Sequence, residues 1–205
     1  MAHRSAPNDP PLIALMQAIS GGDADHVTRT LDEAPELATA RLTADASFDR
    51  PRASYVGDTP LHIAAANHAV GVIERLTERG ADVRARNRRG AEPLHYACVG
   101  QPGSPVWDPE AQAAVVARLI AAGADPEARN MDGAAPLHLA VRTRSATAVK
   151  ALLDAGADIN ARNGSGSTAL LLAAHTTGRS GSGSIEAKAQ QAEIRALLER
   201  RGARI

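Results

Sequence analysis

Three histidines are the residues of this chain whose type and placement first suggest chemistry. His62, His95 and His138 each follow a Pro-Leu dipeptide, at spacings of 33 and 43 residues. A metal site or a proton-transfer site would need such side chains to converge. Similar surroundings repeated at these distances instead place the histidines on successive structural units, too far apart to share one metal ion. We therefore expect a structural role for all three and no metal site.

Other patterns that carry chemistry are missing from the sequence. It has neither the His-Glu-x-x-His nor the Cys-x-x-Cys pattern of zinc sites. The glycine- and serine-rich stretch 178–184 has no lysine and no preceding strand, so it does not indicate a phosphate-binding loop. Cys98 is expected to be a buried, unactivated thiol, and His175 to line a binding groove. These observations predict a protein that is not an enzyme and that uses no cofactor.

The composition points to closely packed helices. Of 205 residues only 2% are aromatic, whereas 44 are alanines. A β-sandwich or an α/β sheet would need more aromatic and β-branched residues. Arg and Lys together number 23, as do Asp and Glu, so the formal net charge is zero. This balance argues against a generally basic nucleic-acid binder.

Cysteine content and hydropathy indicate the cellular compartment of the protein. A single cysteine excludes an intramolecular disulfide and favours a reducing compartment. No apolar run approaches the ~20 residues of a membrane span. The apolar stretch 11–19 is interrupted by Gln17 and preceded by Asp9, which favours a first structural helix over a signal peptide. We expect a cytoplasmic protein rather than a periplasmic or secreted one. Arginine outnumbers lysine 21 to 2, which is typical of a GC-rich, bacterial genome.

An internal repeat organises the chain. The segment GDTPLHIA at 57–64 recurs at 90–97 and 133–140, and more weakly at 166–173. A second motif, Gly-Ala-Asp, begins at Gly80, Gly123 and Gly156, with a partial copy at Gly202. The period is 33, with insertions of 10 and 13 residues. In each copy a proline can begin one helix and a glycine can end the next. Thr59 is a good cap, whereas Glu92 and Ala135 break that pattern.

These motifs resemble the ankyrin repeat over residues 54–205. The resemblance implies an all-α solenoid of helix-turn-helix units joined by β-hairpin-like fingers, with about five repeats including caps. It also implies that the histidine rings hydrogen-bond within their turns and to the next finger. The function implied is non-enzymatic binding of another folded protein through a concave groove and fingers, as an adaptor, inhibitor or regulatory subunit.

The units are expected at the following positions. A flexible tail covers 1–9, and a single domain covers 10–205. Within it, 10–53 form an N-terminal capping repeat with a long connection, 54–86, 87–129 and 130–162 form full repeats, and 163–205 form a C-terminal capping repeat. The final helix, 185–201, is expected to turn a polar face outward.

Three segments depart from the repeat. Residues 38–56 form an overlong connection, and 177–184 are expected to be a mobile loop. Residues 101–110 form an insertion that contains Trp107, after which Asp108 and Pro109 restart a helix. Trp107 either folds back over the helix pair or anchors a partner. The insertion is expected at the edge of the solenoid, away from the concave groove.

The predicted binding residues lie on the fingers and in the groove. The segment 84–89 holds four arginines and no acid, and Arg86, Arg129 and Arg162 share one repeat position, which predicts an arginine ladder. The alternative is a solvated edge whose charge only discourages aggregation. The candidate finger residues are Arg50, Arg52, Arg84, Arg86, Arg88, Arg89, Arg129 and Met131, and the candidate groove residues are Asn67, Arg142 and His175. The main alternative function is binding of nucleic acid or another polyanion through this rim. We expect a monomer.

Overall fold

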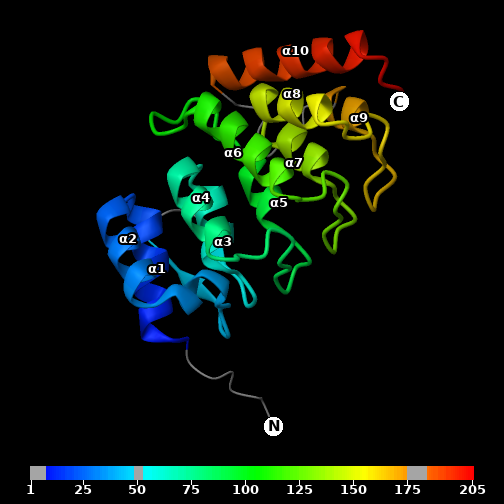
Figure 1. The fold of residues 1–205 in the computed structure, drawn as a ribbon. Coiled ribbons are helices and arrows are strands. Elements are labelled where there is room, and N and C mark those ends of the chain that lie inside the picture. Colours follow the sequence, from blue (N-terminus) through cyan, green and yellow to red (C-terminus); the bar gives the residue numbers. More distant parts are fainter. Residues whose placement is uncertain (1–7, 49–52, 175–183) are drawn as a thin grey trace.

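The computed structural model describes residues 8–48, 53–174 and 184–205, and these form a curved stack of paired helices (Figure 1). This arrangement confirms the predicted all-α solenoid. The pairs, in chain order, are α1 (Pro10–Gly21) with α2 (Ala24–Glu33), α3 (Pro60–Ala66) with α4 (Val70–Glu78), α5 (Pro93–Ala97) with α6 (Pro109–Ala121), α7 (Pro136–Arg142) with α8 (Ala146–Asp154), and α9 (Ala169–Ala174) with α10 (Ile185–Arg200).

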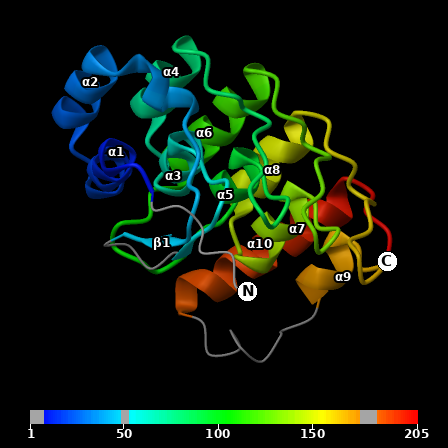
Figure 2. The same cartoon turned by 90° about the horizontal axis from the view of Figure 1, so that it is seen from below.

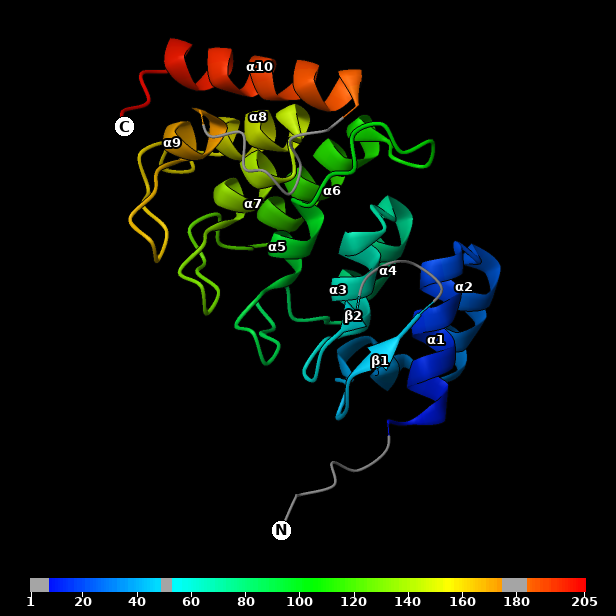
Figure 3. The same cartoon turned by 180° about the vertical axis from the view of Figure 1, so that it is seen from behind.

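The helices form two rows. The first helices of the pairs, α1, α3, α5, α7 and α9, contact one another in sequence and form the inner row. The second helices, α2, α4, α6 and α8, form the outer row, as Figure 2 shows. Helix α10 lies against α8 and α9 and closes the stack at the C-terminal end (Figure 3). Its charged residues face outward while Ala187, Ile194 and Leu198 are buried, as predicted for a cap. Gln190 and Gln191, also expected on the polar outer face, instead hydrogen-bond to the Ala146 amide and the Ala173 carbonyl.

Small residues allow the inner helices to approach closely. Ala64, Ala97 and Ala140 occupy equivalent positions in α3, α5 and α7, and each is completely buried. The outer helices contribute larger apolar residues, such as Ile73 and Leu76 of α4. The core therefore runs continuously along the stack, between the two rows of helices.

Proline and glycine set the limits of the helices as predicted. Pro60, Pro93 and Pro136 are the first residues of α3, α5 and α7. Asp108 caps α6 by accepting a hydrogen bond of 2.9 Å from the Ala111 amide. Glycines 80, 123, 156 and 202 follow the second helices with φ between 81° and 98°. This left-handed conformation favours glycine, which has no Cβ to clash.

The loops between the helix pairs contain little regular strand. In the described residues the only strands are β1 (Ala46–Ser47) and β2 (Ala53–Ser54), an antiparallel pair within the connection after α2. A short 3-10 helix at Pro35–Thr39 precedes them. The fingers of the full repeats, expected to resemble β-hairpins, are turns without strand pairing inside each finger. Each finger is nevertheless closed by two internal backbone hydrogen bonds, as in a hairpin turn; the Asn87 amide, for example, donates to the Ala91 carbonyl at 3.1 Å and the Gly90 amide to the Asn87 carbonyl at 2.8 Å.

Candidate functional site

The three histidines cap the helices that carry the groove. The Nδ1 atoms of His62, His95 and His138 accept hydrogen bonds of 3.1–3.2 Å from the amides of the residues just before α3, α5 and α7. Those preceding residues are Thr59, Glu92 and Ala135. The histidine thus satisfies the same amide whichever residue precedes the proline, which explains how Glu92 and Ala135 are tolerated there.

The same rings join each repeat to the next. The Nε2 atoms of His62 and His95 lie 3.1 and 3.2 Å from the carbonyl oxygens of Ala91 and Ala134 in the following repeat, and that of His138 lies 3.0 Å from the Ala161 carbonyl in the finger after α8. Because Nδ1 accepts a hydrogen bond, the proton is on Nε2, which donates to the carbonyl. Burial lowers the pKa of all three rings, that of His95 to about 4. The histidines are neutral structural links, as predicted.

Each finger is closed by an asparagine to which the sequence analysis assigned no role. The Oδ1 atoms of Asn87, Asn130 and Asn163 each accept two backbone amide hydrogen bonds of 2.9–3.0 Å. The residues follow an Ala-Arg dipeptide at the same spacing as the other motifs. This repetition, together with the tendency of asparagine to bond nearby backbone amides, was the available signal.

Backbone hydrogen bonds link neighbouring fingers. The Arg88 amide donates to the Val56 carbonyl at 2.8 Å, the Met131 amide to Arg89 at 2.9 Å, and the Gly164 amide to Asp132 at 3.1 Å. The fingers approach so closely that a Cβ on Gly133 would lie 2.7 Å from the Gly164 nitrogen. The finger row is therefore one connected surface rather than a set of independent loops.

Arginines at the shared finger position reach toward neighbouring carbonyl groups. A guanidinium nitrogen of Arg129 donates to the Arg162 carbonyl, one repeat further on. Arg41, which the sequence analysis did not place in the ladder, donates in the same way to the Arg86 carbonyl at 3.2 Å. Arg41 also follows an alanine, like Arg86 and Arg129. Arg41 and Arg129 thus brace neighbouring fingers, whereas Arg86 pairs with Glu92 and Arg162 donates to the Gly166 carbonyl of its own finger.

The four arginines of 84–89 all face carboxylates. Arg84 pairs with Asp125 at 3.0 Å, Arg88 with Asp45 at 2.6 Å, and Arg89 with Asp132 at 3.8 Å. Arg88 and Arg89 also lie over the Tyr55 ring, 5.3 and 5.5 Å from its centre. The acids all lie outside 84–89, so a segment without acidic residues in sequence is not a free positive patch in space. The arginine side chains stay 50–55% exposed.

Arg86 has an unusual partner, Glu92. Its Nε donates to Oε1 of Glu92 at 3.0 Å, and that carboxylate is only 1% exposed. The other carboxylate oxygen, Oε2, is buried without a hydrogen-bond partner. Burial raises the pKa of Glu92, and the hydrogen bond and charge of Arg86 oppose that rise. Sequence analysis treated Glu92 only as a break in the capping pattern.

The groove residues that are described lie in different surroundings. Asn67 ends α3 and donates a hydrogen bond of 2.8 Å to the Ile63 carbonyl, with its side chain half-buried. Arg142, at the end of α7, is exposed. Met131 is 77% exposed at the tip of its finger. Arg50, Arg52, His175 and most of the loop 177–184 lie outside the described residues.

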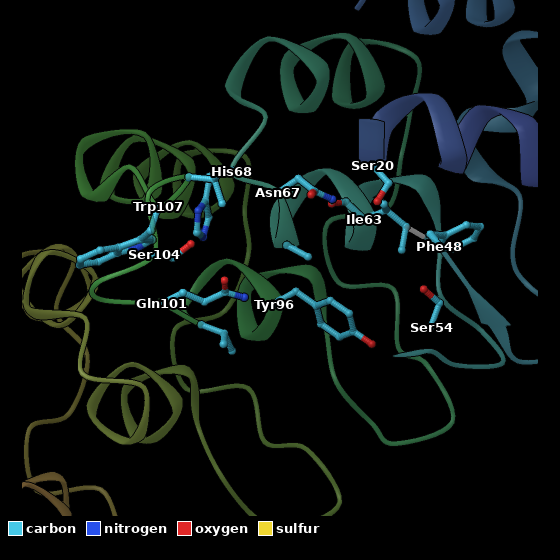
Figure 4. Close-up of a pocket in the computed structure, with 13 residues that line it drawn as sticks. Ser20, Phe48, Ser54, Ile63, Asn67, His68, Tyr96, Gln101, Ser104 and Trp107 are labelled. Atoms are coloured by element: carbon cyan, nitrogen blue, oxygen red, sulfur yellow. The ribbon is translucent and has the colours of Figure 1, made fainter. Parts of the chain in front are cut away.

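Trp107 corrects the expected position of the insertion. Its side chain is half-buried, and Nε1 donates a hydrogen bond of 3.0 Å to Oε1 of Gln112 in α6. It lines a pocket together with Asn67 and Val99 (Figure 4). The insertion therefore borders the concave groove instead of lying away from it. A 33-residue period cannot reveal this, because the path of an insertion depends on contacts that the repeat does not contain.

This pocket has a volume of about 450 Å³ and spans several elements. Figure 4 shows Trp107, Ser104 and His68 at one end, Phe48 and Ser54 at the other, and Tyr96 between them. The described residues that line it are Ser20, Phe48, Ser54, Ile63, Ala66, Asn67, His68, Tyr96, Val99, Gln101, Ser104, Val106 and Trp107.

A buried polar network lies beneath the Tyr96 side of the pocket. The Asp58 carboxylate is completely buried and accepts hydrogen bonds from the Tyr96 hydroxyl at 3.0 Å and the Asn87 amide at 2.8 Å. It also accepts from the Tyr55 amide at 2.8 Å. The Tyr96 ring meets His62 edge-on, with ring centres 5.2 Å apart. These contacts hold the finger that contains Asn87 against α3 and α5.

The only thiol of the chain belongs to Cys98, which directly follows α5. Cys98 is completely buried, and burial raises the pKa of its thiol above the ordinary value. This confirms its predicted apolar role. Among residues 8–48, 53–174 and 184–205 no cluster of histidine, cysteine or carboxylate side chains is arranged to hold a metal ion. Within those same ranges, no helix combines the length and the hydropathy that crossing a bilayer requires.

Comparison with known families agrees with the geometry. One family model described as ankyrin repeats, three copies, matches residues 15–104, and a second, of many copies, matches 119–173. The chain belongs to the ankyrin-repeat family, whose members are generally protein–protein interaction modules. The first match includes part of α1 and all of α2, upstream of the first Pro-Leu-His motif. No curated protein matches the chain.

Proposed function

We propose that this protein is a non-enzymatic module that binds a folded protein through its finger row and concave groove. The observation that carries the proposal is the linkage of the fingers. Each neighbouring pair shares a backbone hydrogen bond, and ion pairs such as Arg84 with Asp125 cross between fingers. A surface already ordered in the free protein loses little entropy on binding.

The exposed side chains on this row supply the recognition. Arg84, Arg88 and Arg89 remain about half exposed although paired, and Met131 is 77% exposed. Arginine and methionine are both enriched in protein interfaces. Pairing of each arginine with a carboxylate lowers the free positive charge, so the observations favour a protein over a nucleic acid or another polyanion.

Charge reversal on the fingers tests this proposal. Arg86 is left unchanged, since a glutamate there would face the buried Glu92 and disturb the fold. The double variant Arg88→Glu/Arg89→Glu is compared with Arg195→Glu, an exposed arginine on α10 far from the fingers along the stack. Proteins captured from a lysate of the source organism are identified, and the affinity of a purified candidate is then measured.

The expected result is a candidate whose affinity falls at least tenfold in the double variant and stays unchanged in Arg195→Glu. Equal affinity for all three proteins would overturn the role of the fingers. Recovery of nucleic acid, with an affinity that falls steeply as salt is raised, would favour the polyanion alternative. Cytoplasmic location and a monomeric state stay predictions, and light scattering of the purified protein tests the latter.

A further inference from the structure

The pocket between the insertion and the β1–β2 pair gathers most of the aromatic residues in the chain. The protein has four Phe, Tyr and Trp residues in total. Three of them, Phe48, Tyr96 and Trp107, line this one pocket. Phe48 and Trp107 belong to two of the three segments that depart from the 33-residue repeat, so they are additions to the repeat framework.

The described lining is uncharged, with His68 as the only side chain that could become positively charged. None of the described lining residues is Asp, Glu, Lys or Arg, although 22% of the chain is charged. The polar groups that are present are hydroxyl and amide side chains, such as Asn67, Gln101 and Ser104. Apolar walls with a few neutral hydrogen-bonding groups are typical of sites for small organic molecules.

The size of the pocket argues for a whole molecule rather than one side chain. Its volume is about 450 Å³. A cavity of about 150 Å³ is enough for benzene, so a single side chain of an interacting protein would leave most of this pocket unfilled. Pockets that hold drug-sized ligands have volumes of about 300–1,000 Å³.

The pocket is also held open by contacts beneath it. Trp107 is fixed by its hydrogen bond to the completely buried Gln112, and the Tyr96 hydroxyl is fixed by Asp58. Gln112 in turn accepts a hydrogen bond of 2.6 Å from Ser145 of the next repeat. Aromatic walls fixed in this way do not need to be ordered by a ligand.

We propose that this pocket binds a neutral, largely apolar small molecule of two or three rings, or a chain of similar volume, that carries one or two hydrogen-bonding groups. This binding site is separate from the protein-binding role proposed above and goes beyond it. Its walls include Phe48, Tyr96 and Trp107, and its neutral polar groups orient the ligand.

The test uses Trp107 itself, because it is the only tryptophan in the chain. The neutral two-ring alcohol 2-decalol, which does not absorb with tryptophan, is titrated into the full-length protein while Trp107 emission is recorded. Decalin-2-carboxylate and decalin-2-amine are titrated in parallel. We expect a saturable emission change with the alcohol, and binding at least tenfold weaker for both charged compounds, because the described walls offer no opposite charge.

Two variants locate the binding. Ala66→Phe fills the pocket from the end of α3, and Met131→Phe adds the same residue to an exposed finger tip. Affinity for the alcohol should fall at least tenfold in Ala66→Phe and stay unchanged in Met131→Phe. The unfolding transition of each variant is measured to show that it is folded. If Ala66→Phe does not fold, the comparison of neutral and charged compounds on the unmodified protein still tests whether the pocket selects a neutral ligand.

Three results would overturn the proposal. One is the absence of any saturable response up to the solubility limit of the alcohol. Another is equal or tighter binding of a charged compound. The third is a response of Trp107 to a protein partner but not to the alcohol, which would make the pocket part of a protein-docking surface.

Discussion

The indole Nε1 of Trp107 donates a hydrogen bond of 3.0 Å to Oε1 of Gln112, a side chain that is completely buried. The Gln112 amide nitrogen donates in turn to the Ala97 carbonyl at 2.8 Å, and Ser145 donates to Oε1 at 2.6 Å. One glutamine thus joins the insertion to α5, α6 and the start of α8. The position of the only tryptophan therefore depends on a residue that no repeat motif identifies.

Replacing Gln112 by methionine should release the insertion. Methionine has a similar shape but supplies no hydrogen bonds, so the buried Ser145 hydroxyl loses its Gln112 partner. We expect a loss of about 2–3 kcal/mol in the free energy of unfolding, and a red shift of Trp107 emission in the folded protein. Urea titration and fluorescence measure both. Gln17→Met, on the exposed face of α1, is the control and should leave both values near those of the unmodified protein.

Close stacking of the fingers predicts different effects for two glycines. Gly133 has φ of 66°, and a Cβ there would lie 2.7 and 2.8 Å from Gly164 backbone atoms. Gly156 has φ of 87°, but a Cβ there would meet nothing within 4 Å. Gly156→Ala should therefore cost about 1 kcal/mol from backbone strain alone, and Gly133→Ala about 3 kcal/mol. Equal losses in denaturant titrations would show that the fingers can separate without cost.

The histidine links predict a loss of stability in mild acid. Burial lowers the pKa of His95 to about 4, below its ordinary value of 6.5, and the pKa values of His62 and His138 are lowered as well. The unfolded chain therefore binds protons first as the pH falls. The stabilisation is complete above pH 6.5 and is lost progressively toward pH 4, by about 3 kcal/mol for His95.

Thermal unfolding from pH 7.5 to 4.5 measures this effect. The midpoint should fall steadily below pH 6.5, and the slope should be smaller in His95→Asn, which removes one titrating ring. His26→Asn, outside the repeat motif, should keep the slope of the unmodified protein. A midpoint that stays constant down to pH 5 would contradict the assignment of buried, neutral rings.

The buried, half-paired carboxylate of Glu92 indicates that replacing this residue should stabilise the protein. Its carboxylate is buried with Oε2 unpaired, whereas Arg86 is 54% exposed and keeps water contact. Glu92→Thr restores the residue found at the same turn position, Thr59, and should add about 1 kcal/mol at pH 7. Because burial raises the pKa of Glu92, the penalty for its charge disappears as the pH falls, so the gain should shrink near pH 4.

Calorimetry at both pH values checks this prediction. Glu33→Thr, an exposed site at the end of α2, is the control and should change stability by about 0.5 kcal/mol or less. A loss of stability in Glu92→Thr at both pH values would mean that the attraction between Arg86 and Glu92 outweighs the cost of burying the carboxylate.

The repeat framework was predictable because it depends on local rules. Pro60, Pro93 and Pro136 begin helices since proline lacks the amide that the first turn leaves unpaired. Gly80 and its equivalents end helices since only glycine adopts the left-handed conformation without strain. The histidine links were implied by the resemblance of the repeated motif to the ankyrin repeat. Asn87 and Arg41 carried the same kind of signal, but the analysis assigned neither of them a role.

The charge pattern of the fingers was not predictable in the same way. Arg84 meets Asp125 and Arg88 meets Asp45, residues about 40 positions away in sequence. Stacking of the repeats brings these pairs together, because residues one repeat apart lie side by side. A local count of charges in 84–89 therefore overstated the positive charge of the rim.

The sequence by itself determined where helices begin and end and how often the unit repeats, because proline and glycine act through short-range geometry repeated at a constant period. Only the tertiary structure decided where the two insertions lie. Phe48 and Trp107 are 59 positions apart, yet they line one pocket beside the groove. The physical reason is that an insertion obeys no repeat: its path is set by long-range contacts, such as that between Trp107 and Gln112, which exist only once neighbouring repeats have packed.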